Sequence, residues 1–339
     1  MRGPLPAIGF QVWGQFTDWP SIAATARRIE ELGFASIYTN DHLFPAAGVA
    51  YQAVDAPPGP FLEGWVTLAG IAMVTSRVEV GVLVSAAGYR NVGLAVKQAT
   101  AIDHLSAGRA VLGLGAGWHL RDHAAFGFTL PPVGERLDRL EEQAAAARAL
   151  LAGETVSADG RHVSLDRAVN LPPPLRDRIP LLIGGSGEKR TLRIVAQHAD
   201  RWNGEGDPET WARRNATLDR HCAVVGRDPN EIRRTVGLPP ASIRPTREAA
   251  VAALADRLQA NGLDAAEARR AAESSPVAGT PEAVRVALRA YAEAGAGEAL
   301  IDWPAPFDER TLTALADIVA GARATSAARD DGARDGTAR

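Results

Sequence analysis

Short apolar or β-branched segments alternate with longer segments of helical periodicity from residue 7 to residue 322. In the first predicted helix, residues 21–32, apolar side chains recur at Ile22, Ala26 and Ile29, and Gly33 is the kind of residue that ends a helix. Predicted strands cover residues 7–12, 36–38, 78–84, 109–114, 180–183, 200–203, 232–242 and 299–302. Predicted helices cover residues 21–32, 63–74, 92–105, 136–151, 189–197, 208–224, two or three segments between 247 and 294, and 309–322.

This pattern amounts to eight successive strand-then-helix units. Eight units without a break in composition favour an α/β fold of the (β/α)8 TIM-barrel type over an open doubly wound sheet. We expect a single domain over residues 1–324, because no linker divides the chain. Long insertions at 43–61, 118–134 and 244–280 directly follow strands, at the C-terminal face where such barrels carry their active sites. A further insertion at 155–170 follows a helix and is predicted to form a short β segment.

Composition narrows the classes of partner and compartment. The 37 basic and 40 acidic residues give a net charge of −3 without a basic stripe, so no nucleic-acid partner is predicted. No window approaches the roughly 20 apolar residues of a membrane span, and no secretory signal is apparent at the start. The single Cys222 excludes an intramolecular disulfide, and a cytoplasmic location is expected. Residues 325–339 lack large apolar side chains and are predicted to form a disordered tail.

Asn40, Asp41 and His42 follow the second predicted strand, at the edge where catalytic groups of a barrel gather. A histidine exchanges protons near neutral pH, and a neighbouring carboxylate can fix its surroundings. His42 and Asp41 are therefore the candidate catalytic residues. The alternative is an aspartate that caps a turn beside a surface histidine.

Two glycine-rich segments follow predicted strands. The segment GLGAGW, residues 113–118, offers bare backbone to a flat ligand at Gly115, Ala116 and Gly117, with Trp118 as a wall. Its alternative is a tight strand-to-loop connection.

The second glycine segment is Gly184, Gly185, Ser186 and Gly187, just before a predicted helix. Backbone N–H groups, a hydroxyl and the helix dipole together suit a phosphate. A plain glycine turn is the alternative, and neither the GxxxxGK[ST] nor the GxGxxG pattern is present.

No metal site is predicted. His119 and His123 have the i,i+4 spacing of zinc ligands, with Asp122 between them, but the first histidine lacks a neighbouring glutamate and no third ligand is evident.

Several segments together carry a family resemblance that spans nearly all of residues 7–322. They are IEELGFASIYTNDH (29–42), EGWVTLAGIAMVTSRVEVGVLV (63–84), YRNVGLAVKQATAIDHLSAGRAVLGLGAGW (89–118), ERLDRLEE (135–142), PLLIGGSGEKRTLRIVAQHADRWN (180–203) and GTPEAVRVALRAYAEAGAGEALID (279–302). With these segments the chain resembles the luciferase-like flavin and deazaflavin oxidoreductases, and within them the branch dependent on coenzyme F420.

The resemblance implies a barrel of the bacterial luciferase-like type with the cofactor ring at the carboxyl ends of the strands. It further implies a non-prolyl cis peptide bond at Ser85-Ala86, next to Val84, behind the ring. Residues 115–118 would line the cofactor, residues 184–187 would hold its phosphate, and Asp41 and His42 would flank its reactive region. A homodimer is also implied.

The implied function is hydride transfer between coenzyme F420 and an unidentified small organic substrate, with His42 as the proton partner and Asp41 holding the ring edge or the histidine. The sugar-phosphate dehydrogenases of the family carry an acidic residue where this chain has Trp118, which argues against a sugar-phosphate substrate. The loops 43–61 and 244–280 are expected to shape the substrate pocket. An apolar or aromatic substrate is suggested by the candidate wall residues Phe44, Tyr51, Phe61, Trp65 and Trp303.

Two alternatives stay open. One is an FMN-dependent monooxygenase that uses O2 and receives reduced flavin from a separate reductase. The other is a non-catalytic flavin-binding protein of the same fold. The polyglutamate tail of F420 distinguishes the two cofactors, because it needs basic groups near the mouth of the site.

Overall fold

The computed structural model describes residues 5–46 and 59–335, with side chains described through residue 322. The strands are β1 (Ala7–Val12), β2 (Ser36–Thr39), β3 (Glu79–Val82), β4 (Ser85–Ala86), β5 (Ala110–Gly115), β6 (Val156–Asp159), β7 (Ser164–Ala168), β8 (Leu181–Gly184), β9 (Arg201–Gly204), β10 (Arg233–Leu238), β11 (Ser242–Ile243), β12 (Ala278–Gly279) and β13 (Glu298–Trp303). The helices are α1 (Trp19–Glu31), α2 (Gly64–Val74), α3 (Val92–Leu105), α4 (Leu120–Ala125), α5 (Val133–Leu151), α6 (Thr191–His198), α7 (Pro208–Val224), α8 (Arg247–Ala260), α9 (Ala265–Ser274), α10 (Pro281–Glu293) and α11 (Glu309–Asp335).

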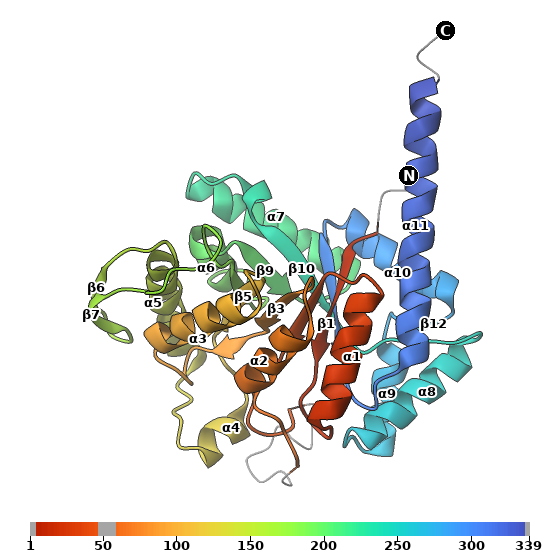
Figure 1. Cartoon of the computed structure of the whole chain (residues 1–339), viewed down its shortest axis with the longest axis horizontal. Coiled ribbons are helices and arrows are strands. Elements are labelled where there is room, and N and C mark those ends of the chain that lie inside the picture. Colours follow the sequence, from red (N-terminus) through yellow and green to blue (C-terminus); the bar gives the residue numbers. More distant parts are fainter. Residues whose placement is uncertain (1–4, 47–58, 336–339) are drawn as a thin grey trace.

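The main sheet is a closed parallel barrel, as the sequence predicts. Its strand order is β3-β2-β1-β13-β10-β9-β8-β5, and β3 closes the ring by pairing with β5. Helices surround the barrel, and at its carboxyl end, at the bottom of Figure 1, α4 lies on one side while α8 and α9 lie on the other. The predicted β segment at 155–170 is the antiparallel hairpin β6–β7, outside the barrel. Among the described residues, no helix has the length and apolar character to cross a membrane.

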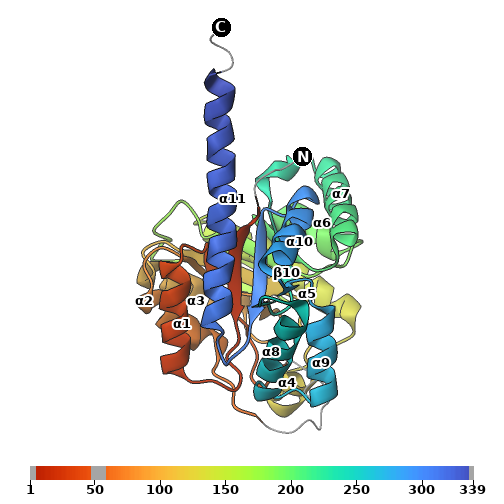
Figure 2. The same cartoon turned by 90° about the vertical axis from the view of Figure 1, so that its right-hand side faces the viewer.

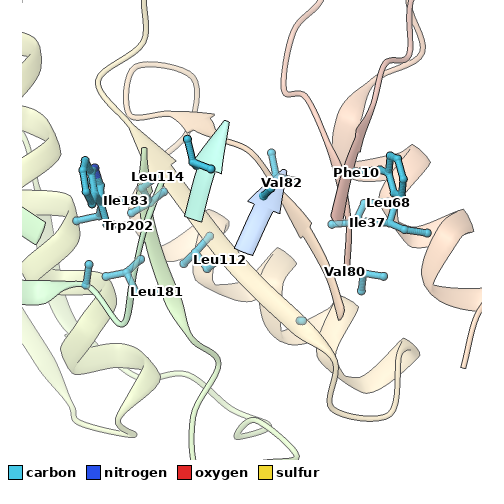
Figure 3. Close-up of a cluster of buried hydrophobic side chains, with 14 of the residues drawn as sticks. Phe10, Ile37, Leu68, Val80, Val82, Leu112, Leu114, Leu181, Ile183 and Trp202 are labelled. Carbon is cyan, nitrogen blue, oxygen red and sulfur yellow. The ribbon is translucent and has the colours of Figure 1, made fainter. Parts of the chain in front are cut away.

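Barrel strands are buried on both faces, so they carry near-continuous apolar runs. Val80 and Val82 of β3 and Leu112 and Leu114 of β5 belong to the layer between strands and helices (Figure 3). Val111 of β5 belongs instead to a separate small cluster with Tyr38, Leu182 and Leu300, one from each of three other barrel strands. The period of two along each strand therefore separates an outer core from an inner one.

The amino end of the barrel is closed by charged side chains. Arg201 donates two hydrogen bonds to Glu79, at 2.6 and 2.9 Å, and Arg233 bridges Glu79 and the fully buried Glu298 at 3.1 Å each. Ser36 Oγ donates to Glu298 Oε1 at 2.5 Å. This network lies away from the catalytic face of such barrels, and its role is structural.

The end of β3 departs from the expected geometry. The resemblance places a non-prolyl cis peptide bond at Ser85-Ala86, but the cis bond is at Leu83-Val84, two residues earlier, so that prediction is wrong. The physical reason is strand pairing: Ser85 and Ala86 resume parallel pairing with Leu114 and Gly115 as β4, and the break in the ladder falls before them.

The carboxyl-terminal end also differs from expectation. Residues 325–335, predicted as part of a disordered tail, continue α11 as helix to Asp335. Figures 1 and 2 show α11 projecting beyond the amino end of the barrel.

Helices α8 and α9, within the predicted insertion 244–280, form a hairpin with a hydrophobic cluster of its own. The cluster includes Leu254, Leu258, Leu263 and Ala272 and is separate from the main core. Figure 2 shows the two helices side by side.

We predict that Gly113→Ala strongly destabilises the barrel. A Cβ atom at this position would overlap the backbone carbonyl oxygen of Val82 on the neighbouring strand, and backbone atoms cannot move aside cheaply. The expected loss in unfolding free energy is on the order of 3 kcal/mol, measured by urea denaturation. The matched control is Gly134→Ala in α5, where a Cβ meets nothing within 4 Å. Equal stability of the two variants would contradict this packing.

Candidate active site

A cavity of about 1170 Å³ opens at the carboxyl ends of the barrel strands. Such a volume holds a tricyclic ring together with a small substrate. Most of the predicted site residues line it: Asp41, His42, Val84, Ala86, Gly115, Ala116, Gly117, Trp118, Gly184, Gly185 and Gly187. Ser85 and Ser186 do not line it, and both instead support neighbouring groups by hydrogen bonds.

Gly115 and Gly184 line the cavity and also pack against the Val84 side chain. A Cβ at Gly115 would lie 2.5 Å from a methyl group of Val84, and a Cβ at Gly184 would lie 2.9 Å from the other. The glycines thus make room for the Val84 side chain, which follows the cis peptide bond and fills the space between β5 and β8. A ligand would rest on Val84 and the adjoining backbone rather than on the glycines alone.

The predicted phosphate loop begins at the end of β8. Gly185 has φ +131°, a conformation that other residues rarely adopt, and its N–H donates to the Asn203 carbonyl at 2.9 Å. A Cβ at Gly187 would lie 2.8 Å from Thr191 Oγ1, in the first turn of α6. Ser186 Oγ accepts a hydrogen bond from the Glu205 N–H at 3.1 Å. The loop is therefore an open cradle at a helix N-terminus, of the kind that receives phosphate.

Asp41 is held by ionic contacts. Its buried carboxylate accepts hydrogen bonds from Ser85 Oγ at 2.6 Å and from both terminal nitrogens of Arg90. Arg90 also donates to Glu63 at 2.9 Å. Of the two roles expected for Asp41, holding the ring edge or holding His42, the second is not seen: its carboxylate binds Arg90 and Ser85.

His42 is held by Asp122. His42 Nδ1 lies 2.8 Å from Asp122 Oδ2, and His119 Nδ1 lies 2.9 Å from the same oxygen. Tyr89 donates its hydroxyl to Oδ2 at 2.9 Å, while the backbone N–H groups of Leu43 and Phe44 donate to Oδ1 at 3.2 and 2.9 Å. Burial raises the pKa of Asp122, but the hydrogen bonds from His119 and His42 outweigh it and hold this pKa well below its usual range. Asp122 is thus an ionised anchor for the loops after β2, β4 and β5.

Comparison with known proteins identifies the family. The sequence profile of the luciferase-like monooxygenases matches residues 9–298. The chain belongs to this family.

Relatives within and around the luciferase-like family include F420-dependent enzymes. The chain is 30% identical over 288 residues to an F420-dependent hydroxymycolic acid dehydrogenase of Mycobacterium tuberculosis, an alignment that covers 81% of this chain and 77% of that protein. An uncharacterized protein of the same organism is 31% identical over 191 residues, which span 53% of this chain and 66% of that relative.

Solved structures confirm the luciferase-like barrel. An F420-dependent secondary alcohol dehydrogenase in complex with an F420-acetone adduct superposes with a TM-score of 0.79 at 18% identity, covering 94% of this chain and 99% of that one. A long-chain alkane monooxygenase shares the fold with a TM-score of 0.72 at 16% identity, covering 94% and 91%.

His119 and His123, for which the sequence predicts no metal site, have different partners. His123 Nδ1 bonds the His119 carbonyl at 2.8 Å, whereas His42, His119 and Asp122 form the cluster whose ligand atoms lie within 4.8 Å of one another. The distances of 2.8 and 2.9 Å from the two histidine Nδ1 atoms to Asp122 Oδ2 are hydrogen-bond distances. We describe the cluster as a hydrogen-bonded network.

Sequence reasoning missed Asp122 as an anchor and Asp302 as a site residue. Asp122 lies in the first turn of the loop helix α4, and apart from His119 its partners are distant in sequence. Asp302 lies near the carboxyl end of β13 and lines the cavity, and its position at a strand end is the signal that marks it. Burial raises the pKa of Asp302 to about 7, with a further contribution from the charge of Glu205.

The aromatic wall differs from expectation. Among the described residues proposed for it, Phe44, Phe61, Trp65 and Trp303 do not line the cavity. Trp65 and Trp303 pack in the core, because apolar aromatic side chains contribute more when buried between strands and helices. Tyr51 lies outside the described residues. Trp13, Trp118 and Tyr291 line the cavity instead.

We predict that Asp122→Asn destabilises the fold by roughly 2–4 kcal/mol at pH 7, because the variant loses the buried charge that its donors require. A lowered folded-state pKa contributes stability above the unfolded pKa of about 3.9 and loses it as pH falls. The gap between parent and variant should therefore narrow below about pH 4, as measured by urea denaturation at several pH values. Asp166→Asn, at an exposed position on β7, is the control. A gap that is independent of pH would disprove the anchoring charge.

Proposed function

We propose that this chain transfers a hydride between coenzyme F420 and a small organic substrate. The observation that carries the proposal is that one cavity is lined by three features. These are the glycine loop after β8, which suits a phosphate, Val84 with the adjoining residues 115–118, which suit a flat ring, and His42, which is held by Asp122. Membership of the luciferase-like family and the F420-dependent relatives support the same activity.

The residues present fit such a cofactor. A Cβ at Gly185 or Gly187 would press against Thr191 in the first turn of α6, so the loop packs closely on a helix N-terminus, a position that suits the phosphate. Val84, with Gly115–Trp118 beside it, would support the ring. When bound, F420 accepts or supplies the hydride.

His42 would exchange the accompanying proton. Since its Nδ1 faces Asp122, Nε2 is the nitrogen left for a substrate in the cavity. Oxidation of an alcohol removes a hydride from carbon and a proton from oxygen, and that proton would pass to Nε2. The ionised Asp122 would stabilise the resulting imidazolium and keep the ring oriented.

Basic groups near the mouth support F420 over FMN. Arg136 donates to the Gly117 carbonyl, Arg214 donates to the Glu205 carbonyl, and both carbonyls belong to residues that line the cavity. Arg190 donates to the Gly134 carbonyl at 3.0 Å. These guanidinium groups would attract the anionic tail of F420 where it leaves the barrel.

The alternatives make different demands. An FMN monooxygenase would need reduced flavin from a separate reductase. A non-catalytic flavin-binding protein would not need His42 in the cavity, and His42 lines it.

The homodimer is a further proposal. Helix α2 carries no charged side chain, and its Val66 and Met73 are exposed, which suits pairing with a second copy. The cytoplasmic location stays a prediction.

We predict that F420 binds more tightly than FMN and that Gly185→Val abolishes binding while the barrel stays folded. Valine disfavours φ +131° and would press its Cβ to 3.2 Å from Thr191 Cγ2. Dissociation constants are measured by fluorescence titration, and folding by circular dichroism. Gly226→Val is the control, because Gly226 also has positive φ but a Cβ there meets nothing within 4 Å. Tighter binding of FMN would reverse the cofactor assignment, and unchanged affinity of Gly185→Val would refute the phosphate cradle.

We predict that His42→Ala keeps cofactor affinity within a few fold and lowers turnover by about 100-fold or more, the usual scale for a lost general acid or base. The measurement is stopped-flow oxidation or reduction of bound cofactor with the best alcohol or ketone from a substrate screen. His104→Ala, at an exposed position on α3, is the control. If cofactor affinity collapses while the chemical step stays intact, His42 is a binding residue.

A further inference from the structure

Asp302 lines the cavity on the side opposite Val84 and residues 115–118, which are proposed to support the cofactor ring and are called the cofactor platform below. In the closed strand order, β13 lies four positions from β5 in either direction, so Asp302 and Gly115 stand on opposite walls. Asp302 pairs in register with Gln11 of β1, and Gln11 pairs with Tyr38 of β2. His42 is four residues beyond Tyr38, so Asp302 lies deeper in the barrel than His42. A substrate between platform and opposite wall would therefore meet Asp302.

The surroundings of Asp302 offer it no cation. Its hydrogen-bond partner is the Trp13 side chain, and the charged group that acts on it is the Glu205 carboxylate. Both residues also line the cavity. With a pKa raised to about 7 by burial, this carboxyl is present in both its acidic and its ionised form near neutral pH.

The charged side chains that line the cavity are acidic. Among the described lining residues there is no lysine or arginine, and the segment 47–58 contains none in its sequence. Glu205 and Asp207, just after β9, add negative charge near Asp302. The arginines near the mouth act from outside the lining, beside the glycine loops. A second anionic group on the substrate would meet repulsion at this wall.

The wall next to Asp302 continues into an apolar surface. The strand β10, neighbour of β13, ends at Leu238, which lines the cavity together with Pro239. Leu258 and Leu263 of the α8–α9 hairpin extend this lining. The space beyond the carboxyl is therefore suited to an apolar body.

We propose that the substrate is an uncharged alcohol or carbonyl compound with an apolar body, and that Asp302 binds its oxygen and excludes carboxylates and phosphates. The protonated carboxyl donates a hydrogen bond to the substrate oxygen, whether this is a carbonyl oxygen or an alcohol oxygen whose own O–H points to His42 Nε2. The same side chain thus serves both members of the redox pair. This inference rests on the proposed hydride transfer and adds the class of its substrate.

The test compares two probes of similar shape, acetophenone and benzoate, on the F420-loaded protein at pH 7.5 by ligand-observed NMR. We expect acetophenone to bind at least about tenfold more tightly than benzoate. Asp302→Asn keeps an N–H donor and removes the charge, so acetophenone affinity should stay within about twofold while benzoate affinity rises about tenfold. Asp302→Ala removes the donor and should weaken acetophenone binding about fivefold or more. Asp166→Asn, the exposed control, should change neither affinity.

Three outcomes would overturn the proposal. The first is equal affinity of the parent for the two probes, and the second is unchanged benzoate affinity in Asp302→Asn. The third is that acetophenone does not bind at a concentration of about 20 mM, on the order of the largest dissociation constant expected for such contacts. The same titrations without cofactor separate this inference from the proposed function. Loss of F420 binding with intact probe selectivity would refute the cofactor assignment and leave the substrate class standing.

Discussion

The Val84 side chain lies where two glycines of neighbouring strands, Gly115 and Gly184, leave space for it. Much of the active-site geometry depends on this packing. Val84 lies between the end of β3 and the start of β4, where pairing with β5 resumes. The resumed strand brings Ser85 to Asp41, and through Asp41 it helps to fix Arg90. The Val84 side chain thus forms part of the cavity lining, next to the strand β4 that contacts the ion pair between Asp41 and Arg90.

Asp122 holds together the loops that follow β2, β4 and β5. Loops after three different strands place N–H or O–H donors on its two oxygens. A buried charge is tolerable only with such a set of donors, so the loops must adopt this arrangement together. His42 is oriented as part of that requirement, which links its chemistry directly to the folding of the loops.

The fold was predictable because the periodicity of apolar residues and the capping residues mark most strands and helices in the local sequence. The helices at 92–105 and 208–224 have the predicted bounds, since their capping residues Asn91 and Asp207 and their periodicity agree. What failed depends on contacts between distant residues. The cis bond was placed two residues late because strand pairing sets it. The packing of Gly115 and Gly184 against Val84 was missed because Val84, just before β4, is distant from both glycines in sequence. Asp122 went unrecognised as an anchor because most of its partners are distant in sequence, whereas Asp302 could have been found from its position near a strand end.

The α8–α9 hairpin has an evolutionary consequence. Its residues pack into a cluster separate from the main core, yet Leu258 and Leu263 also form part of the cavity wall. Mutations there can reshape the wall without repacking the barrel or disturbing the platform, the cradle or His42. Lineages of this protein can therefore diversify in the molecules they accept while the redox machinery stays constant.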